Sequence, residues 1–200
     1  MAGDPKNACR RRGAVAFLDE SGFAFRPLAL RTWAPRGKTP ILVNSERDRR
    51  ALSAVSAIVW RPKARRARRR FGLYFQLHDD TIKTAQVIGF LRHLLRHVQG
   101  PIDLVWDRLG AHRSAETRRF LARHRRLKTH FFPPYAPDTN PDEFVWAHAK
   151  KNGLAHYTPD HRSHLRAQVQ RVLTQMQPRH NLFAAFIRAA GLSTNMDEGQ

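Results

Sequence analysis

The chain has 200 residues, a length that suits one domain with a buried core. Its 42% content of hydrophobic residues argues against disorder throughout, and its single cysteine, Cys9, excludes an internal disulfide and fits a reducing compartment. The formal net charge is +20, so the basic side chains repel one another unless a polyanion lies between them. This favours a polyanionic partner, and nucleic acid is the leading candidate.

A membrane-surface protein is the rival explanation for so basic a chain. Its basic runs, however, lack the clean apolar face of an interfacial amphipathic helix. No N-terminal apolar run resembles a signal peptide, and the longest apolar stretch, residues 51–60, is far shorter than the ~20 residues of a spanning helix. We therefore expect a cytoplasmic protein with no membrane partner.

The first 80 residues predict strands and turns. Residues 1–13 are polar and basic and are expected to be a tail or the remnant of a linker. Residues 30–42 have the Pro and Gly of a turn between short strands. Buried strands are predicted at 14–25, 51–60 and 71–77. The segment 61–70 holds seven Arg or Lys and predicts a hairpin with a basic tip.

The rest of the chain alternates helices with strands. A helix is predicted over 81–98, and its apolar residues at helical spacing are Ile82, Ala85, Ile88, Gly89, Leu91, Leu95 and Val98. Further strands are expected at 102–107 and 127–132, and helices at 114–124, 140–153, 159–176 and 181–191. An antiparallel meander followed by this alternation implies one mixed sheet with helices on its faces.

Three acids lie at the ends of predicted strands or just beyond them. Asp19 ends the apolar run "AVAFLD" (14–19) and Asp107 ends the strand 102–107, each near a sheet edge, and Glu143 lies in the first turn of the helix after a proline-rich loop. Three converging carboxylates need a cation, and oxygen ligands suit Mg²⁺ or Mn²⁺ rather than zinc. Two such ions can clamp the attacking and leaving oxygens of a phosphodiester.

Each acid also has a structural alternative. Asp19 alone could be a surface acid, with Glu20 a neighbour rather than a ligand. Asp103, earlier on the same strand, is the rival of Asp107. Asn140 as N-cap with Glu143 at the third helical position is close to a capping box, which would stabilise the helix start without any metal.

Other residues suggest contact with a phosphate backbone. The segment 61–70 is either a solvated hairpin tip or a phosphate-binding one, and its candidate DNA-binding residues are Arg65, Arg66, Arg68, Arg69 and Arg70. Lys150 lies two turns beyond Glu143 on the same helix face and could also reach DNA. His112 could contact DNA, orient a metal site or be a plain loop histidine. Trp146 and Phe144 are expected in the core, and the histidines of 156–164 do not suit zinc.

Four segments resemble a known family: "FLDESGF" (17–23), "TWAPRGKTPIL" (32–42), "VWDRLGAH" (105–112) and "PPYAPDTNPDEFVW" (133–146). Together they resemble the catalytic domain of DDE transposases from bacterial insertion sequences related to eukaryotic mariner elements. The resemblance runs from about residue 14 to about residue 160. The last segment is the most specific, and the 36 positions from Asp107 to Glu143 lie within the range of such enzymes.

The resemblance implies an α/β, RNase H-like domain over residues 14–192, with about five strands in a mixed sheet flanked by helices and a flexible tail at 193–200. It implies Asp19, Asp107 and Glu143 as a triad that holds two Mg²⁺ ions, with Mn²⁺ as a substitute. Such enzymes cut DNA at the element's ends, and the freed 3′-hydroxyl then attacks target DNA. The expected partners are DNA, a second copy in the DNA complex and an upstream-encoded helix-turn-helix subunit, at the nucleoid.

The sequence departs from the family pattern at two positions beside the acids. Arg108 stands where the family usually has Asn, so it could pair with Asp107 or contact a phosphate. Asp142 stands where the family usually has an apolar residue, so it adds repulsion or offers another ligand. An alternative function is therefore a truncated, non-catalytic DNA-binding remnant or regulator of transposition. A basic RNA-binding protein without an active site would leave the three acids unexplained.

Overall fold

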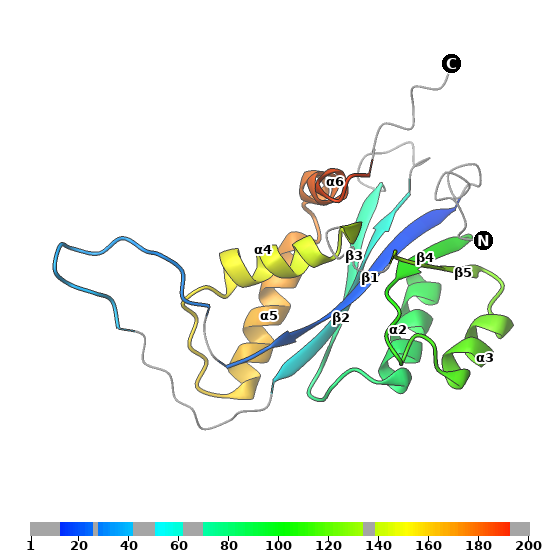
Figure 1. Ribbon diagram of the computed structural model, residues 1–200, viewed down its shortest axis with the longest axis horizontal. Coiled ribbons are helices and arrows are strands. Elements are labelled where there is room, and N and C mark those ends of the chain that lie inside the picture. The colour runs from blue at the N-terminus through cyan, green and yellow to red at the C-terminus, as the bar shows by residue number, and fades with distance from the viewer. Residues whose placement is uncertain (1–12, 26–27, 42–50, 62–69, 134–138, 193–200) are drawn as a thin grey trace, which may run out of the picture.

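The structure, a computed structural model, describes residues 13–25, 28–41, 51–61, 70–133 and 139–192. In these ranges the strands are β1 (Ala14–Phe23), β2 (Leu52–Trp60), β3 (Phe71–His78), β4 (Ile102–Trp106) and β5 (Leu127–Phe131). The helices are α2 (Thr84–His97), α3 (Ala115–Arg123), α4 (Glu143–Gly153), α5 (Arg162–Met176) and α6 (His180–Ala189) (Figure 1).

The five strands form one mixed sheet in the order β3-β2-β1-β4-β5. β2 is antiparallel to both of its neighbours, β1 and β3, as the predicted meander requires. β4 and β5 then join parallel to β1, because each follows a helix that crosses over the sheet. The mixed sheet flanked by helices confirms the predicted fold class, and it places β1 at the centre.

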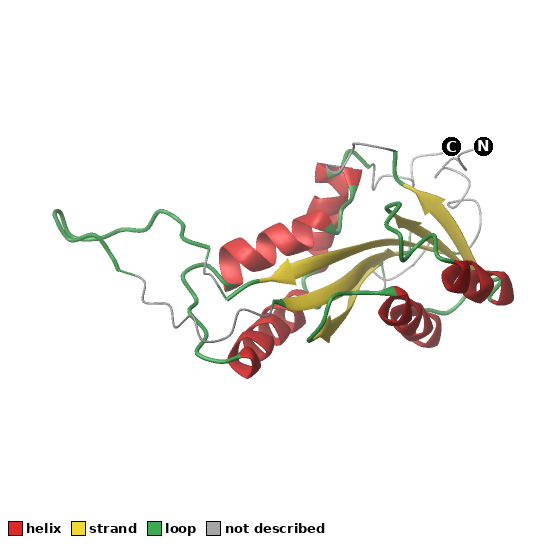
Figure 2. Ribbon diagram, turned by 60° about the horizontal axis from the view of Figure 1, so that its bottom comes forward, coloured by secondary structure: helices red, strands yellow, loops and turns green. Residues whose placement is uncertain are grey.

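Helices cover both faces of the sheet (Figure 2). α4, α5 and α6 bury one face against a core that includes Val15, Phe17 and Phe23 of β1. α2 and α3 bury the other face against Ala16 and Leu18. Successive β1 side chains therefore enter different cores, as the two-residue period of a strand dictates.

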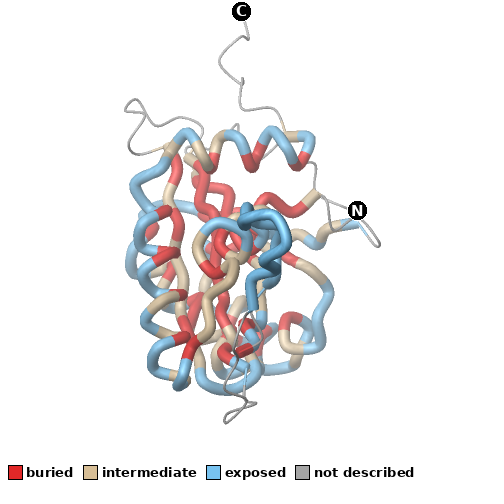
Figure 3. Tube along the Cα trace, turned by 90° about the vertical axis from the view of Figure 1, so that its left-hand side faces the viewer, coloured by how far each residue is buried: buried red, intermediate tan, exposed pale blue. Residues whose placement is uncertain are grey.

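Because both faces are covered, β2 is buried along almost its whole length, and the central strands read as continuous apolar runs. Figure 3 shows the buried residues along the strands and the inner sides of the helices, with exposed residues outside. The result is a stiff central sheet whose strand ends hold their side chains in fixed places.

The predicted inward face of α2 was partly wrong. The buried residues of the helix are Val87, Phe90, Leu91 and Leu94, so of the predicted helical face only Leu91 is buried within α2. Ala85 is exposed. The bulky Phe90 and its neighbours Val87 and Leu94 set the helix rotation, because they remove more apolar surface from water than Ala85 and Gly89 would.

The predicted turn in 30–42 is present, but the short strands on either side of it are not. Residues 28–41 are all exposed, and their described β contact is a single bridge between Leu28 and Ala155. The turn itself closes through the Lys38 N–H and the Pro35 carbonyl at 3.0 Å, with Gly37 at a φ of 79°. Without a buried face, this segment has nothing to hold it as a strand.

No helix among the described residues is both long and apolar enough to span a bilayer. The predicted tails at 1–13 and 193–200 lie outside the described residues, apart from Gly13. The boundaries of the domain at these ends therefore stay a prediction.

Candidate active site

Asp19 and Asp107 lie on neighbouring parallel strands. The pairs run from Ala14 with Ile102 to Phe17 with Val105, and two further steps in this register bring Asp19 opposite Asp107. Asp107 lies one residue past the end of β4, and 44% of its side chain is exposed. The predicted juxtaposition of these two acids follows directly from the sheet topology.

Glu143 is the first residue of α4 and is exposed. Its charge is felt by Asp19: burial raises the pKa of Asp19 to about 8, and the negative charges of Glu143, Glu20 and Asp107 add to the effect. An acid whose ionisation is opposed in this way favours a nearby cation. The structure thus brings the three predicted acids into one electrostatic environment.

Trp146 orients Asp19. Its indole N–H donates to Oδ2 of Asp19 at 3.0 Å, and its ring packs edge-on against Phe23. Trp146 is 2% exposed, which confirms its predicted place in the core. The hydrogen bond was not predicted, because nothing local in the sequence links residues 127 positions apart.

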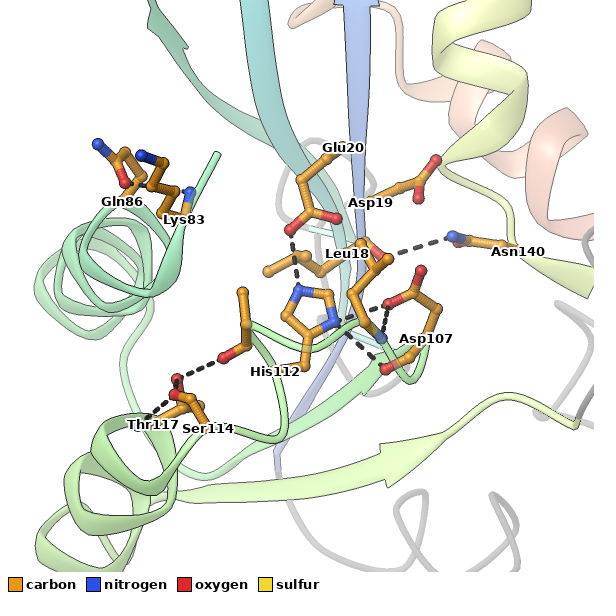
Figure 4. Close-up of polar contacts among 12 residues, drawn as sticks. Leu18, Asp19, Glu20, Lys83, Gln86, Asp107, His112, Ser114, Thr117 and Asn140 are labelled. Atoms are coloured by element: carbon orange, nitrogen blue, oxygen red, sulfur yellow. Dashed lines mark hydrogen bonds and ion pairs between the residues drawn. The ribbon is translucent and has the colours of Figure 1, made fainter. Parts of the chain in front are cut away.

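His112 joins Asp107 to Glu20 (Figure 4). Its Nδ1 lies 2.7 Å from Oδ1 of Asp107, its Nε2 lies 2.8 Å from Oε1 of Glu20, and its buried ring stacks on Trp106. Burial opposes a charge on the imidazole, but the hydrogen bonds to Asp107 and Glu20 raise the pKa of His112 to about 9. At neutral pH both ring nitrogens therefore carry protons and donate.

Asp107 is held by more than His112. The Leu109 N–H also donates to Oδ1 of Asp107, at 3.0 Å. Burial works to raise the pKa of Asp107, but the hydrogen bonds from His112 and Leu109 outweigh it, and the pKa is lowered. Asp107 is thus an ionised carboxylate with Oδ1 fixed from inside, which leaves Oδ2 available to a ligand.

Asp142 is fully buried beneath the start of α4 and is neither a surface charge nor an exposed ligand. Ser56 of β2 donates to Oδ2 of Asp142 at 2.5 Å. Burial raises the pKa of Asp142 well above its usual range, so a negative charge on this carboxyl is strongly disfavoured. The departure from the family pattern therefore places a buried polar link between α4 and β2.

Asn140 and Glu143 do not form the capping box that we considered. α4 begins at Glu143 rather than at residue 140, and its N-cap position, Asp142, makes no side-chain cap hydrogen bond. Asn140 instead accepts from the Asp142 N–H at 3.1 Å and donates to the Leu18 carbonyl at 3.4 Å. The proline-flanked Asn140 thus ties the loop to β1, and the Glu143 side chain is not turned back into a cap.

The basic residues near the site have distinct places. The Arg108 guanidinium lies over the Phe131 ring at 5.2 Å, so its described contact is with an aromatic ring. Lys150 donates to the Ser21 hydroxyl at 2.9 Å, two residues beyond Asp19. Arg70 directly precedes β3, whereas Arg65, Arg66, Arg68 and Arg69 lie outside the described residues. Asp103, the rival of Asp107, is bonded to His130 at 2.9 Å and is 8% exposed.

An open cleft of about 390 Å³ adjoins Glu20 on the side away from α4. Its walls include Ser21, Gly22, Thr81 and Leu109. Gly22 has nothing within 4 Å of the place where a Cβ would stand. The cleft therefore lies open beside Glu20 and the loop that follows Asp107.

The residues present fit a divalent cation with oxygen ligands. Asp19, Asp107 and Glu143 offer carboxylates, and the raised pKa of Asp19 marks the place where positive charge is missing. Among the described residues, the group whose ligand atoms all lie within 4.8 Å of one another is instead Glu20, Asp107 and His112. A doubly protonated His112 has no lone pair to offer, however, so this second group acts as a hydrogen-bonded network instead.

Comparisons with known proteins agree with this fold. The family model for "DDE superfamily endonuclease" matches residues 14–166. The Mos1 transposase paired-end complex with left transposon end superposes with a TM-score of 0.60 at 16% identity, over 93% of this chain and 56% of that chain. The Mos1 mariner paired end complex with Mn superposes with a TM-score of 0.60 at 16% identity, over 93% of this chain and 57% of that chain.

The Mos1 transposase catalytic domain with Raltegravir and Mg gives a TM-score of 0.56 at 14% identity, over 93% of this chain and 89% of that chain. At such low identity these likenesses show the RNase H-like fold alone. The chain spans 56% and 57% of the length of the two paired-end complex chains. No curated protein is a significant match to the sequence.

Proposed function

Because the chain belongs to the DDE superfamily of endonucleases, we propose that it is the catalytic core of a transposase that cuts DNA at the ends of a mobile element and joins it to target DNA. The observation that supports this proposal is the parallel register of β1 and β4, which sets Asp19 opposite Asp107, together with the hydrogen bond from Trp146 of α4 to Asp19. Burial raises the pKa of Asp19, and the negative charges of Glu143, Glu20 and Asp107 add to that effect. We propose these three residues as the catalytic, metal-holding triad of a bacterial insertion-sequence enzyme.

Divalent ions held by the triad would supply an activated water and would neutralise the charge that develops on the phosphodiester. Mg²⁺ is the expected ion and Mn²⁺ its substitute, with two ions per site. Solved Mos1 structures with Mn and with Mg support this choice.

The chain's own residues hold the carboxylates in place. Trp146 orients Asp19 from α4, and His112 with the Leu109 N–H orients Asp107 from the loop after β4. Asn140 ties the segment before Glu143 to β1, which fixes where α4 starts. The site is therefore built on rigid elements, as catalysis by positioning requires.

The proposed chemistry has two steps. First, water attacks the phosphorus at an element end, the P–O3′ bond breaks, and the leaving 3′ oxygen takes a proton. Then the freed 3′-hydroxyl attacks a phosphodiester of target DNA, and one P–O bond forms as another breaks. Arg65, Arg66, Arg68, Arg69, Arg70 and Lys150 would bind the backbone meanwhile.

The proposed partners follow from the same function. Paired cleavage of two ends calls for a second copy in the DNA complex, and recognition of the ends calls for a helix-turn-helix partner. The neighbours include a Mos1 complex with a transposon end, which supports DNA as the ligand. The proposed location is the nucleoid.

The test is nicking of supercoiled plasmid by the purified chain with Mn²⁺. The wild-type chain is expected to nick, and Asp107→Ala is expected to lose at least about 10²-fold, because one carboxylate is removed from the site. Asp160→Asn, an exposed acid in the α4–α5 connection, is the matched control and should nick like the wild type.

Equal nicking by the wild type and Asp107→Ala would refute the assignment of the active site. An inactive wild type that still binds DNA would support the alternative, a non-catalytic DNA-binding remnant or regulator. The described contact of Arg108 with Phe131, rather than with Asp107, favours the active enzyme.

A further inference from the structure

A strongly basic surface lies on the α2–α3 side of the sheet, apart from the residues already considered for DNA. Between residues 84 and 128 the sequence has ten Arg or Lys and three acids. Two of these acids are engaged elsewhere: Asp103 bonds His130, and Asp107 belongs to the candidate site. Only Glu116 remains to balance the cations, and the charge of this region is therefore largely uncompensated.

The arginines of α3 point away from the protein core. Thr117 and Phe120 are the buried residues of this helix; at 100° per residue Arg118 and Arg119 fall on the opposite side, and Arg123 falls on its flank. All three are exposed. Glu116 lies 3.6 Å from Arg119, but both side chains are more than half exposed, so this pair contributes little.

The basic surface extends beyond α3 at both ends and onto α2. Arg113 precedes the helix and Arg125 follows it, and both are exposed. On α2 the exposed Arg92 lies over the Phe120 ring at 5.6 Å, so it stands directly beside α3. Arg126 is not part of the surface, because it donates to the carbonyls of Leu95 and Val98, each at 2.9 Å.

This surface is fixed relative to the candidate site. The loop from Asp107 to Ser114 enters α3 directly, Ser114 caps the helix, and the Thr117 hydroxyl donates to the Ala111 carbonyl at 2.7 Å. Figure 4 shows Ser114 and Thr117 at the start of α3, below His112 and Asp107. The basic row therefore begins at Arg113, next to His112, and runs away from the exposed carboxylate of Asp107.

We propose that the α3 surface, formed by Arg92, Arg113, Arg118, Arg119, Arg123 and Arg125, binds the phosphate backbone of duplex DNA to one side of the phosphate that is cut. This inference rests on the proposed function and gives that site a second, previously unassigned DNA contact. The nine-residue helix is about 14 Å long, which matches about four base-pair steps.

Duplex DNA fits this surface better than other polyanions do. The only aromatic residue of α3, Phe120, is buried, so the helix offers no ring on which unpaired bases could stack. Its large apolar residues, Phe120 and Leu121, pack in or against the core, so it has no bulky apolar side to insert into a lipid surface. What remains is a row of guanidinium groups, which suits the regular phosphates of a duplex.

The test compares two triple variants that remove the same charge. R118Q/R119Q/R123Q removes the three arginines of α3, and R171Q/R179Q/R188Q removes three exposed arginines from the α5–α6 side. Glutamine keeps helix propensity close to that of arginine, so both variants should fold. Binding to a fluorescein-labelled 30-base-pair duplex is measured by anisotropy over a range of KCl concentrations.

The α3 variant is expected to bind the duplex roughly 10²-fold more weakly at about 0.1 M KCl, and its slope of log affinity against log salt should fall by about 0.9 for each phosphate that the variant no longer neutralises. The α5–α6 variant should keep the wild-type slope. Equal losses of affinity in both variants would show that only net charge matters and would overturn the proposal. Wild-type affinity in the α3 variant would overturn it as well.

Two further arms separate the alternatives. The same two variants are also tested with single-stranded RNA and with anionic lipid vesicles. If the α3 variant lost affinity for one of these ligands but kept its affinity for the duplex, the surface would bind that polyanion and our assignment to duplex DNA would be refuted. Phosphate-ethylation interference on the duplex should lose its signals on only one side of the cut phosphate. Plasmid nicking is scored separately, so a failure of the proposed catalysis leaves the binding result readable.

Discussion

Asp19 is the residue at which catalysis and stability should conflict most clearly. Between pH 4 and 8 the folded chain keeps a proton on Asp19 that the unfolded chain has lost, because burial and neighbouring acids raise the pKa of Asp19 to about 8. The free energy of unfolding without metal should therefore fall as pH rises through this window. Asp19→Asn removes the charge while its amide oxygen still accepts from Trp146.

We expect Asp19→Asn to abolish nicking yet to raise the free energy of unfolding at pH 8 in EDTA by about 2–4 kcal/mol, with little gain at pH 4. Urea unfolding at the two pH values measures this difference. Asp160→Asn, at an exposed acid, should show no comparable gain. A loss of stability in Asp19→Asn at pH 8 would contradict the electrostatic account.

Glu20 should support Asp107 through His112. The protonated His112 ring stabilises the folded chain because the pKa of His112 is raised to about 9 on folding. This contribution is complete below pH 6.5 and is lost as pH rises through about 9. Glu20→Gln keeps an acceptor at Nε2 but removes one charge, so the pKa of His112 should fall. We then expect nicking about 10–100-fold below wild type at pH 8 and near wild type at pH 6.

Imidazole ¹⁵N chemical shifts of His112 measure the same change without any activity. They should report a charged ring at pH 8 in the wild type and a neutral ring in Glu20→Gln. A charged ring in both proteins would show that Asp107 alone holds the proton, and Glu20 would then have no positioning role.

At the level of single residues, the sequence reveals the candidate acids but not the side chains that orient them. Asp19 and Asp107 could be found because each follows an apolar run, and Glu143 because a proline-rich loop precedes its helix. The expectation that Asp19 ends its strand was wrong, because β1 continues past it to Phe23 through its pairing with β2. The Glu20–His112 and Ser56–Asp142 contacts span 92 and 86 residues, and no local pattern predicts them. The triad itself stays a prediction until the nicking assay is done.

Among the elements, the contact of α4 with α5 depends on a glycine. A Cβ on Gly153, at the end of α4, would lie 2.4 Å and 2.6 Å from the two γ carbons of Val172 in α5. Gly153→Ala should therefore destabilise the fold by about 1–3 kcal/mol through overpacking. Because α4 carries Glu143 and Trp146, nicking should fall as well.

The matched control is Gly89→Ala in the interior of α2, where a Cβ would meet nothing within 4 Å. Since alanine has the higher helix propensity, this variant should gain about 0.5–1 kcal/mol. Thermal unfolding of the two variants should thus give shifts of opposite sign. A stabilised Gly153→Ala would show that α4 can move away from α5 at little cost.

The elements themselves were largely predictable, since β1, β2 and β4 are buried on both faces and read as apolar runs. The rotation of α2 was only partly predictable, because Val87, Phe90 and Leu94 fill the core while Ile82, Ile88 and Leu95 pack against it and stay partly exposed. The strands expected around the turn at 35–38 failed for a different reason: β propensity needs a neighbouring strand and a face to bury.

For the whole molecule, the net charge of +20 should lower the stability of the fold through self-repulsion and raise its affinity for DNA. The Debye length falls from about 10 Å at 0.1 M to about 3 Å at 1 M salt. Raising KCl over this range should raise the melting temperature by screening self-repulsion, while affinity for duplex DNA falls by orders of magnitude. Differential scanning fluorimetry and anisotropy measure the two effects.

The variant R118Q/R119Q/R123Q serves as the control, because with three fewer positive charges it should gain less stability from salt than the wild type does. A melting temperature that does not change with KCl concentration would mean that the charges are too far apart to repel one another.

The central position of β1 has a consequence for the chain as it leaves the ribosome. β2, the antiparallel neighbour of β1, is made early, but β4, its other neighbour, starts about 88 residues after β1, and the helix with Glu143 comes later still. Contacts between distant parts of a chain form slowly during folding. The proposed site is therefore incomplete until about three-quarters of these residues have been synthesised, so on the proposed function a nascent chain halted before α4 should leave DNA uncut.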